Sequence, residues 1–146
     1  MSKNKAIEYL ERYKKATQLI RRCEEELEIE NQLIDTVRSA SDIDGMPRGS
    51  EVSNPTEVKA IRLVDKRNRL KEAIIEAVQV QQDIFDTIME IGGIEADVLI
   101  ERYINLKTWT EVCESVNYSW YPVRQAWHRG IDMIDEILRE RDKQHI

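Results

Sequence analysis

The chain has 146 residues, 34% of them charged, with a formal net charge of −6 and only 5 glycines and 3 prolines. This composition favours helix and suits one globular domain, or a small domain with a helical extension. The acidic balance excludes broad electrostatic coating of nucleic acid, although it leaves room for a local reading surface.

The first predicted helix covers residues 3 to 40, where apolar residues recur at heptad spacing. A helix with so long an apolar stripe is not stable alone and must pack against another helix, in the same chain or in a second copy. The acidic run from Glu24 to Glu30 is interpreted as a solvated face. The stripe comprises Ala6, Tyr13, Ile20, Leu27 and Ile34, with Tyr9, Ala16, Cys23 and Val37 as its companion seam.

Residues 41 to 54 are rich in Gly, Pro and Ser and are expected to form a loop. Asn54 then caps a second long helix, with Pro55 in its first turn. The two helices are expected to fold back as an antiparallel, coiled-coil-like hairpin over residues 1–91, which oligomerises the protein. Whether they pair within one chain or between chains stays open. The second stripe comprises Leu63, Leu70, Ala77, Ile84 and Ile91.

Residues 94–146 are predicted to form a three-helix domain after a glycine hinge at residues 92 and 93. Its first helix is expected over residues 95–104. Thr108 and Glu111 form a capping box at the start of a short second helix. Ser119 is expected to cap the last helix, which runs from Trp120 to about residue 141. The predicted fold class is therefore all-α, a long helical hairpin followed by a helix-turn-helix domain.

The last helix has the features of a recognition helix, because polar and aromatic residues lie near its N-terminal end. Val123, Ala126 and either Ile131 or Met133 are expected to face inward, which leaves Trp120, Tyr121, Arg124, Gln125, His128 and in one arrangement Trp127 outward. Arg124 suits a bidentate contact to guanine and Gln125 one to adenine, while Lys107 and Arg129 suit phosphates. The residues predicted to bind double-stranded DNA are Lys107, Thr108, Ser119, Trp120, Tyr121, Arg124, Gln125, His128 and Arg129. The alternative is an ordinary helical hairpin with core aromatics and solvated charges.

The motifs of this region resemble a known family. Residues 99–103 (LIERY), residues 108–112 (TWTEV) and residues 119–125 (SWYPVRQ) are similar to the region of sigma factors that reads the promoter −35 element. The resemblance covers about a third of the chain. In that family a polar pair follows the serine, whereas this chain has Trp120 and Tyr121, and Cys113-Glu114-Ser115 replaces the usual turn entry.

The whole chain resembles a narrower group, the ArpU-like late transcription regulators of Gram-positive phages and prophages. Residues 9–13 (YLERY), residues 53–55 (SNP) and residues 99–103 stand where that group has matching segments. The resemblance implies a transcription regulator that acts in the cytoplasm of a bacterial host.

No catalytic constellation, metal-ligand spacing or cofactor-binding loop is found in the sequence, so neither enzyme activity nor a cofactor is expected. Cys23 and Cys113 lie far apart in the chain and are expected to be free thiols in a reducing compartment. No cleavable signal or apolar run long enough to cross a membrane is seen, which predicts a cytoplasmic protein with no membrane partner.

Two further functions remain open. A small terminase subunit, which starts DNA packaging, also combines a helix-turn-helix with oligomerising helices. A protein-interaction module could use the exposed aromatics to contact RNA polymerase. From Ile104 to Gly130 the formal charge is only +1. A homodimer, a higher oligomer or the polymerase is therefore expected to supply further attraction to phosphate.

Overall fold

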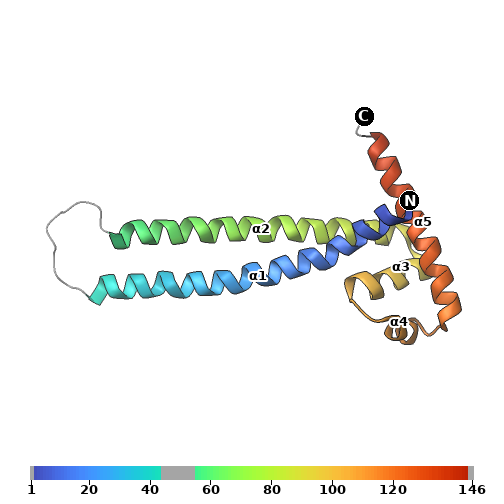
Figure 1. The fold of residues 1–146 in the computed structure, drawn as a ribbon, viewed down its shortest axis with the longest axis horizontal. Coiled ribbons are helices and arrows are strands. Elements are labelled where there is room, and N and C mark those ends of the chain that lie inside the picture. The colour runs from blue at the N-terminus through green and yellow to red at the C-terminus, as the bar shows by residue number, and fades with distance from the viewer. Residues whose placement is uncertain (1, 44–54, 145–146) are drawn as a thin grey trace. The chain divides into compact units, whose positions relative to one another are not determined.

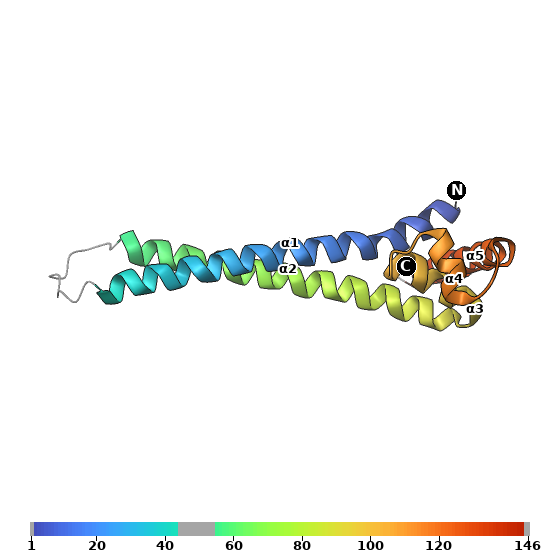
Figure 2. The ribbon, with the colours of Figure 1, turned by 90° about the horizontal axis from the view of Figure 1, so that it is seen from below.

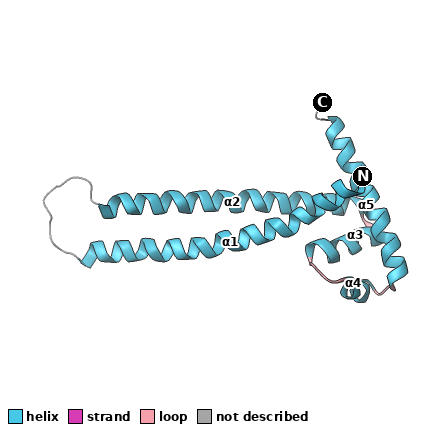
Figure 3. Cartoon of the chain, viewed as in Figure 1, coloured by secondary structure: helices cyan, strands magenta, loops and turns pink. Residues whose placement is uncertain are grey.

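The computed structural model describes residues 2–43 and 55–144, and every regular element in these ranges is helical (Figures 1 and 3). The predicted all-α fold class is confirmed for this part of the chain. In chain order the elements are α1 (Ser2–Ile43), α2 (Pro55–Ile91), α3 (Gly93–Leu99), the π-helical segment η1 (Ile100–Ile104), α4 (Trp109–Val116) and α5 (Trp120–Gln144).

The chain divides into two compact units. The composite unit comprises Met1–Thr17 and Val78–Ile146, and the two-helix unit comprises Gln18–Ala77. The boundary expected at residues 91–94 differs from this division, because the last turns of α2 share a core with the C-terminal helices. Both long helices therefore contribute one end to the composite unit.

The larger core of the composite unit joins the ends of α1 and α2 to α3 and α5. Its fully buried side chains include Leu10, Ile84, Leu99 and Ile134, one from each of these helices. Burying each such side chain contributes about 1.5–3 kcal/mol relative to leaving it exposed. The end of α1 is thus a structural part of the C-terminal unit.

A smaller core holds α4 against α3 and the first half of α5. It consists of Val98, Val112, Val123 and Ala126, all fully buried. Val123 and Ala126 are inward-facing as predicted, and so is Ile131, whereas the alternative inward residue Met133 is 38% exposed.

Polar side chains join the ends of three helices in the composite unit. The Tyr9 hydroxyl donates to Asp83 of α2 and lies 2.9 Å from the Thr87 hydroxyl. Arg141 of α5 donates from Nη2 to the same Thr87 oxygen at 2.9 Å. Burial raises the pKa of Tyr9, and its hydrogen bond to Asp83 adds to this shift. These contacts fix α5 to both α1 and α2 near its C-terminal end.

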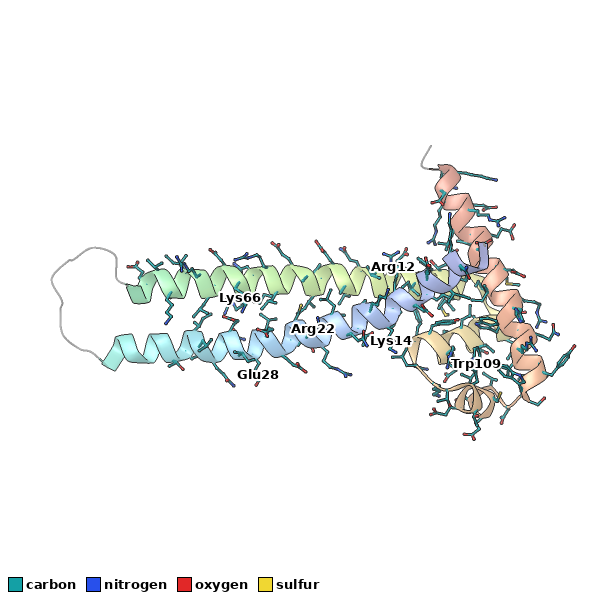
Figure 4. The ribbon with its side chains drawn as sticks, in the orientation of Figure 1. Arg12, Lys14, Arg22, Glu28, Lys66 and Trp109 are labelled. Carbon is teal, nitrogen blue, oxygen red and sulfur yellow. The ribbon has the colours of Figure 1, made fainter. Side chains whose placement is uncertain are left out.

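In the two-helix unit, α1 and α2 run side by side in opposite directions (Figures 1 and 2). Lys66 of α2 lies against α1, where its Nζ is 2.8 Å from a Glu30 oxygen (Figure 4). Arg67 donates to the Asn31 side chain at 3.5 Å. Polar side chains thus contact one another between helices where a coiled coil usually has apolar ones.

One prediction about this unit is wrong. Glu30 was expected on a solvated face, but it is only 3% exposed. Glu30 follows Cys23 by seven residues, so it occupies the companion seam of α1 and necessarily faces α2. Its second oxygen, Oε2, is buried without a hydrogen-bond partner.

Some expectations fall on parts that the structure does not describe. The loop expected at residues 41–54 lies outside the described residues from residue 44 onward, as does the capping residue Asn54, and the side chain of Val37 is likewise outside. The described part of α2 begins at Pro55, as expected.

Candidate nucleic-acid interface

The helix that precedes the expected reading helix is fixed at both ends. At its start, the Glu111 amide donates to the Thr108 hydroxyl at 3.3 Å and the Thr108 amide donates to the Glu111 carboxylate at 3.2 Å, which confirms the capping box. This hydrogen bonding lowers the pKa of Glu111. At its end, Asn117 adopts the left-handed conformation with φ 61°, which turns the chain toward α5. Thr108 therefore has a structural role in capping α4.

The first turns of α5 separate buried from exposed residues. Val123 and Ala126 are fully buried against α3 and α4. Arg124 and Gln125 lie between them in sequence and are exposed. Neither side chain forms a hydrogen bond or ion pair with another residue of the described ranges. Both side chains are thus accessible to an external partner.

Two large aromatic residues begin the same helix. Trp120 is 47% exposed and Tyr121 is 70% exposed. The ring of Trp120 contacts that of Trp109 edge to face, with centroids 5.2 Å apart. Ser119 is also exposed, and its carbonyl accepts the first backbone hydrogen bond of α5 from Val123 at 3.3 Å. The helix start therefore presents an apolar surface beside the polar pair.

The two residues expected to hold phosphates are paired with carboxylates of the chain. Lys107 forms an ion pair with Glu101, and the Nε of Arg129 donates to Glu95 at 2.9 Å. These bonds lower the pKa values of both glutamates: the hydrogen bond from Lys107 is the largest cause for Glu101, and that from Arg129 for Glu95. The local carboxylates thus reduce the attraction of both cations for phosphate.

Trp127 packs in the interior of the composite unit and does not face outward. It lies against both cores and donates from Nε1 to the Tyr103 hydroxyl at 3.0 Å. Burial raises the pKa of Tyr103, and the bond from Trp127 partly opposes this shift. His128 is partly exposed and its ring lies 4.7 Å from that of Trp127. Trp127 is thus held by packing and by its bond to Tyr103, and His128 beside it is partly exposed.

The structure adds a residue that sequence reasoning did not single out. The guanidinium carbon of Arg102 lies 4.6 Å from the centroid of the Trp109 ring, which is marked in Figure 4, and its Nη1 donates to the Lys107 carbonyl at 3.0 Å. Arg102 projects from η1, where the helix expected over residues 95–104 widens to π-helical geometry. Its place in the LIERY motif was the available sign of a positioning role.

Among the described residues no cluster of three or more His, Cys, Asp or Glu side chains is placed to hold a metal ion. Within the same ranges no helix combines the length and apolarity needed to span a bilayer. Comparisons with protein-family models, curated proteins and solved structures find no match to the chain.

Proposed function

We propose that the protein is a sequence-specific regulator of transcription that reads double-stranded DNA with the first turns of α5. In this proposal η1, α4 and α5 form a helix-turn-helix head, and the paired α1 and α2 form an oligomerising stalk. The observation that carries the proposal is the exposure of Arg124 and Gln125 opposite the buried Val123 and Ala126.

The chemistry of this pair suits the edges of bases. The guanidinium of Arg124 can donate two hydrogen bonds to guanine, and the Gln125 amide can donate and accept at adenine. Both lie at the N-terminal end of the helix, where recognition helices meet the major groove. The resemblance to ArpU-like regulators supports a role in phage or prophage gene control.

The test compares two arginines of the same helix. The DNA site is first selected from genomic fragments bound by the full-length protein. Arg124→Ala should then weaken binding to that site by about 1–3 kcal/mol, with a smaller effect on unrelated DNA. Arg139→Ala removes the same charge about 22 Å further along α5 and should leave selectivity intact. Equal site affinity of folded Arg124→Ala and wild type would remove Arg124 from the reading surface.

The two-helix unit supports a proposal of self-association. Among its described residues, six large apolar side chains are 42–57% exposed, and a second copy of the unit could cover them. Sedimentation would report the number of copies: a dimer favours the regulator, and a closed ring of many copies favours a packaging subunit such as a small terminase. The six residues are Leu19, Ile29, Leu33, Val58, Ile61 and Ile75.

A second candidate function is binding to a protein such as RNA polymerase, because Trp120 and Tyr121 are exposed and aromatic side chains are enriched at interfaces. The full chain is needed for this test, since α3 and α5 pack on the ends of α1 and α2. A Trp120→Ala, Tyr121→Ala double variant that loses polymerase binding but keeps full DNA affinity and selectivity would favour the interaction module.

A further inference from the structure

A half-open hollow of about 360 Å³ lies beside the first turns of α5. All three tryptophans of the chain line it, together with Arg124 and His128. The remaining wall residues are Ile7, Glu11, Arg102 and Tyr103. Its volume is at the lower end of the range of ligand sites, and is large enough for the edge of one planar ring.

The aromatic walls are held in place before any ligand binds. The ring of Trp109 meets Trp120 at 67° and Trp127 at 82°, with centroids 5.2 and 5.8 Å apart. Trp127 is further fixed by its hydrogen bond to Tyr103, and Arg102 lies over Trp109. A ligand entering the hollow therefore has few side chains to immobilise, which lowers the entropic cost of binding.

The charges around the hollow are mixed. Arg124 of α5 brings a guanidinium, one turn from the His128 ring, while Glu11 brings a carboxylate from α1. That carboxylate opposes a phosphate group in the hollow, while Arg102 keeps its positive charge, because its Nη1 donates to the neutral Lys107 carbonyl. The three indole rings give the hollow apolar walls, which suit an uncharged group with an apolar face.

The position of the hollow relates it to base reading. Trp120 precedes Arg124 by four residues, so the two side chains are neighbours on one helix face. In the major groove the single apolar group that a base presents is the 5-methyl of thymine. A methyl group next to the base pair contacted by Arg124 would meet the exposed part of the Trp120 ring.

We infer that this hollow receives the methyl-bearing edge of a thymine adjacent to the base pair that Arg124 reads. The inference rests on the proposed function and adds to it a specificity residue, Trp120, and a base. It also gives a reason for an aromatic residue at a position where the sigma-like pattern is polar.

The experiment replaces each thymine of the selected site, one at a time, by deoxyuridine, which lacks only the methyl group. Binding of full-length protein is followed by anisotropy of labelled DNA. The base pair read by Arg124 is identified as the one whose substitution weakens binding of the wild type but not of Arg124→Ala. At one thymine beside that base pair, deoxyuridine should weaken wild-type binding about fourfold, which is the value expected for one methyl-sized group. All three tryptophans line the hollow, so DNA binding is expected to quench the tryptophan fluorescence of the protein. This quenching should be smaller with DNA that has deoxyuridine at that one position than with the unmodified site.

Variants separate the hollow from general effects. Trp120→Ala should abolish the difference between thymine and deoxyuridine, and Trp120→Phe should retain part of it. Tyr118→Ala is a matched control, since Tyr118 is 52% exposed but precedes α5, and it should retain the full difference. Site-specific binding that is insensitive to deoxyuridine at every thymine would overturn the inference and leave the proposed function standing. Absence of any sequence-selective DNA binding would overturn both.

Discussion

The two units differ in how many of their apolar residues are buried. Among the residues whose burial is described, fourteen of the seventeen buried apolar residues belong to the composite unit, and the other three are Cys23, Ile34 and Ala77 of the two-helix unit. In the same described part of the chain, the largest fully buried side chains all lie in the composite unit. The two-helix unit instead has half-exposed apolar residues and charged pairs between its helices. The two-helix unit therefore has little buried apolar surface to stabilise it, whereas the composite unit has a core of its own.

Matched truncations on α2 should show the largest contrast between the units. Ile84 is fully buried in the composite unit and Ile61 is 56% exposed in the two-helix unit. Ile84→Ala should reduce the free energy of unfolding by about 2–5 kcal/mol, because it leaves a cavity. Ile61→Ala should cost less than about 0.5 kcal/mol at low protein concentration. Urea titration measures both, and an equal loss would contradict the comparison.

Removal of a polar group should change the free energy of unfolding in opposite directions in the two units. Tyr9→Phe deletes the hydroxyl that joins α1 to Asp83 and Thr87, and should cost about 1 kcal/mol. Glu30→Leu should be neutral or stabilise by about 1 kcal/mol, because it removes a buried oxygen without a partner and leaves Lys66 half exposed to water. Thermal melting of both variants tests this, and a strong loss in Glu30→Leu would show that the charge is needed.

A single methyl group should test how closely the composite core is packed. A Cβ atom on Gly130 would lie 3.1 Å from Cδ1 of Leu99, which is fully buried and cannot move aside easily. Gly130→Ala should therefore cost about 1 kcal/mol net, since crowding exceeds the gain in helix propensity. In a Leu99→Ala background the same change should be neutral or favourable, and additive losses in the double variant would argue against this contact.

Lowering the pH should destabilise the composite unit, and this is the smallest of the four expected effects. The pKa values of Glu95 and Glu101 are lowered in the folded chain, so their contribution is present above the ordinary glutamate value of 4.5 and is lost as the pH falls below it. Each partly exposed pair should contribute about 0.5 kcal/mol. In a Glu95→Gln, Glu101→Gln double variant the melting temperature should depend less on pH between pH 5 and about pH 3 than in the wild type. The same pH dependence in both proteins would exclude these two ion pairs as the cause of the loss of stability in acid.

Local patterns predicted much of the architecture. Heptad spacing indicated the pairing faces of α1 and α2, and the spacing of Thr108 and Glu111 indicated the start of α4. The exposure of Arg124 and Gln125 agrees with the helical period of α5 around Val123 and Ala126.

Other features depend on residues that are distant in sequence. The contacts among Tyr9, Asp83, Thr87 and Arg141 join three helix ends, and no local pattern signals them. The membership of the α1 end in the composite unit was missed for the same reason. Glu30 was missed although its spacing from Cys23 was readable, because charge was given more weight than heptad position. The aromatic hollow required the turn after α4 to bring Trp120 beside Trp109.

The Arg141 bonds have a consequence for the mobility of α5. The 25 residues of α5 form one continuous rod of about 37 Å, with Trp120 at one tip and Arg141 one turn from the other. This helix is held near both ends, by the bonds of Arg141 to Thr87 and Tyr9 and by the burial of Val123 and Ala126 against α3 and α4. Loosening the bond from Arg141 to Thr87 should therefore free the last turns of α5 and leave its first turns, with Trp120, in place.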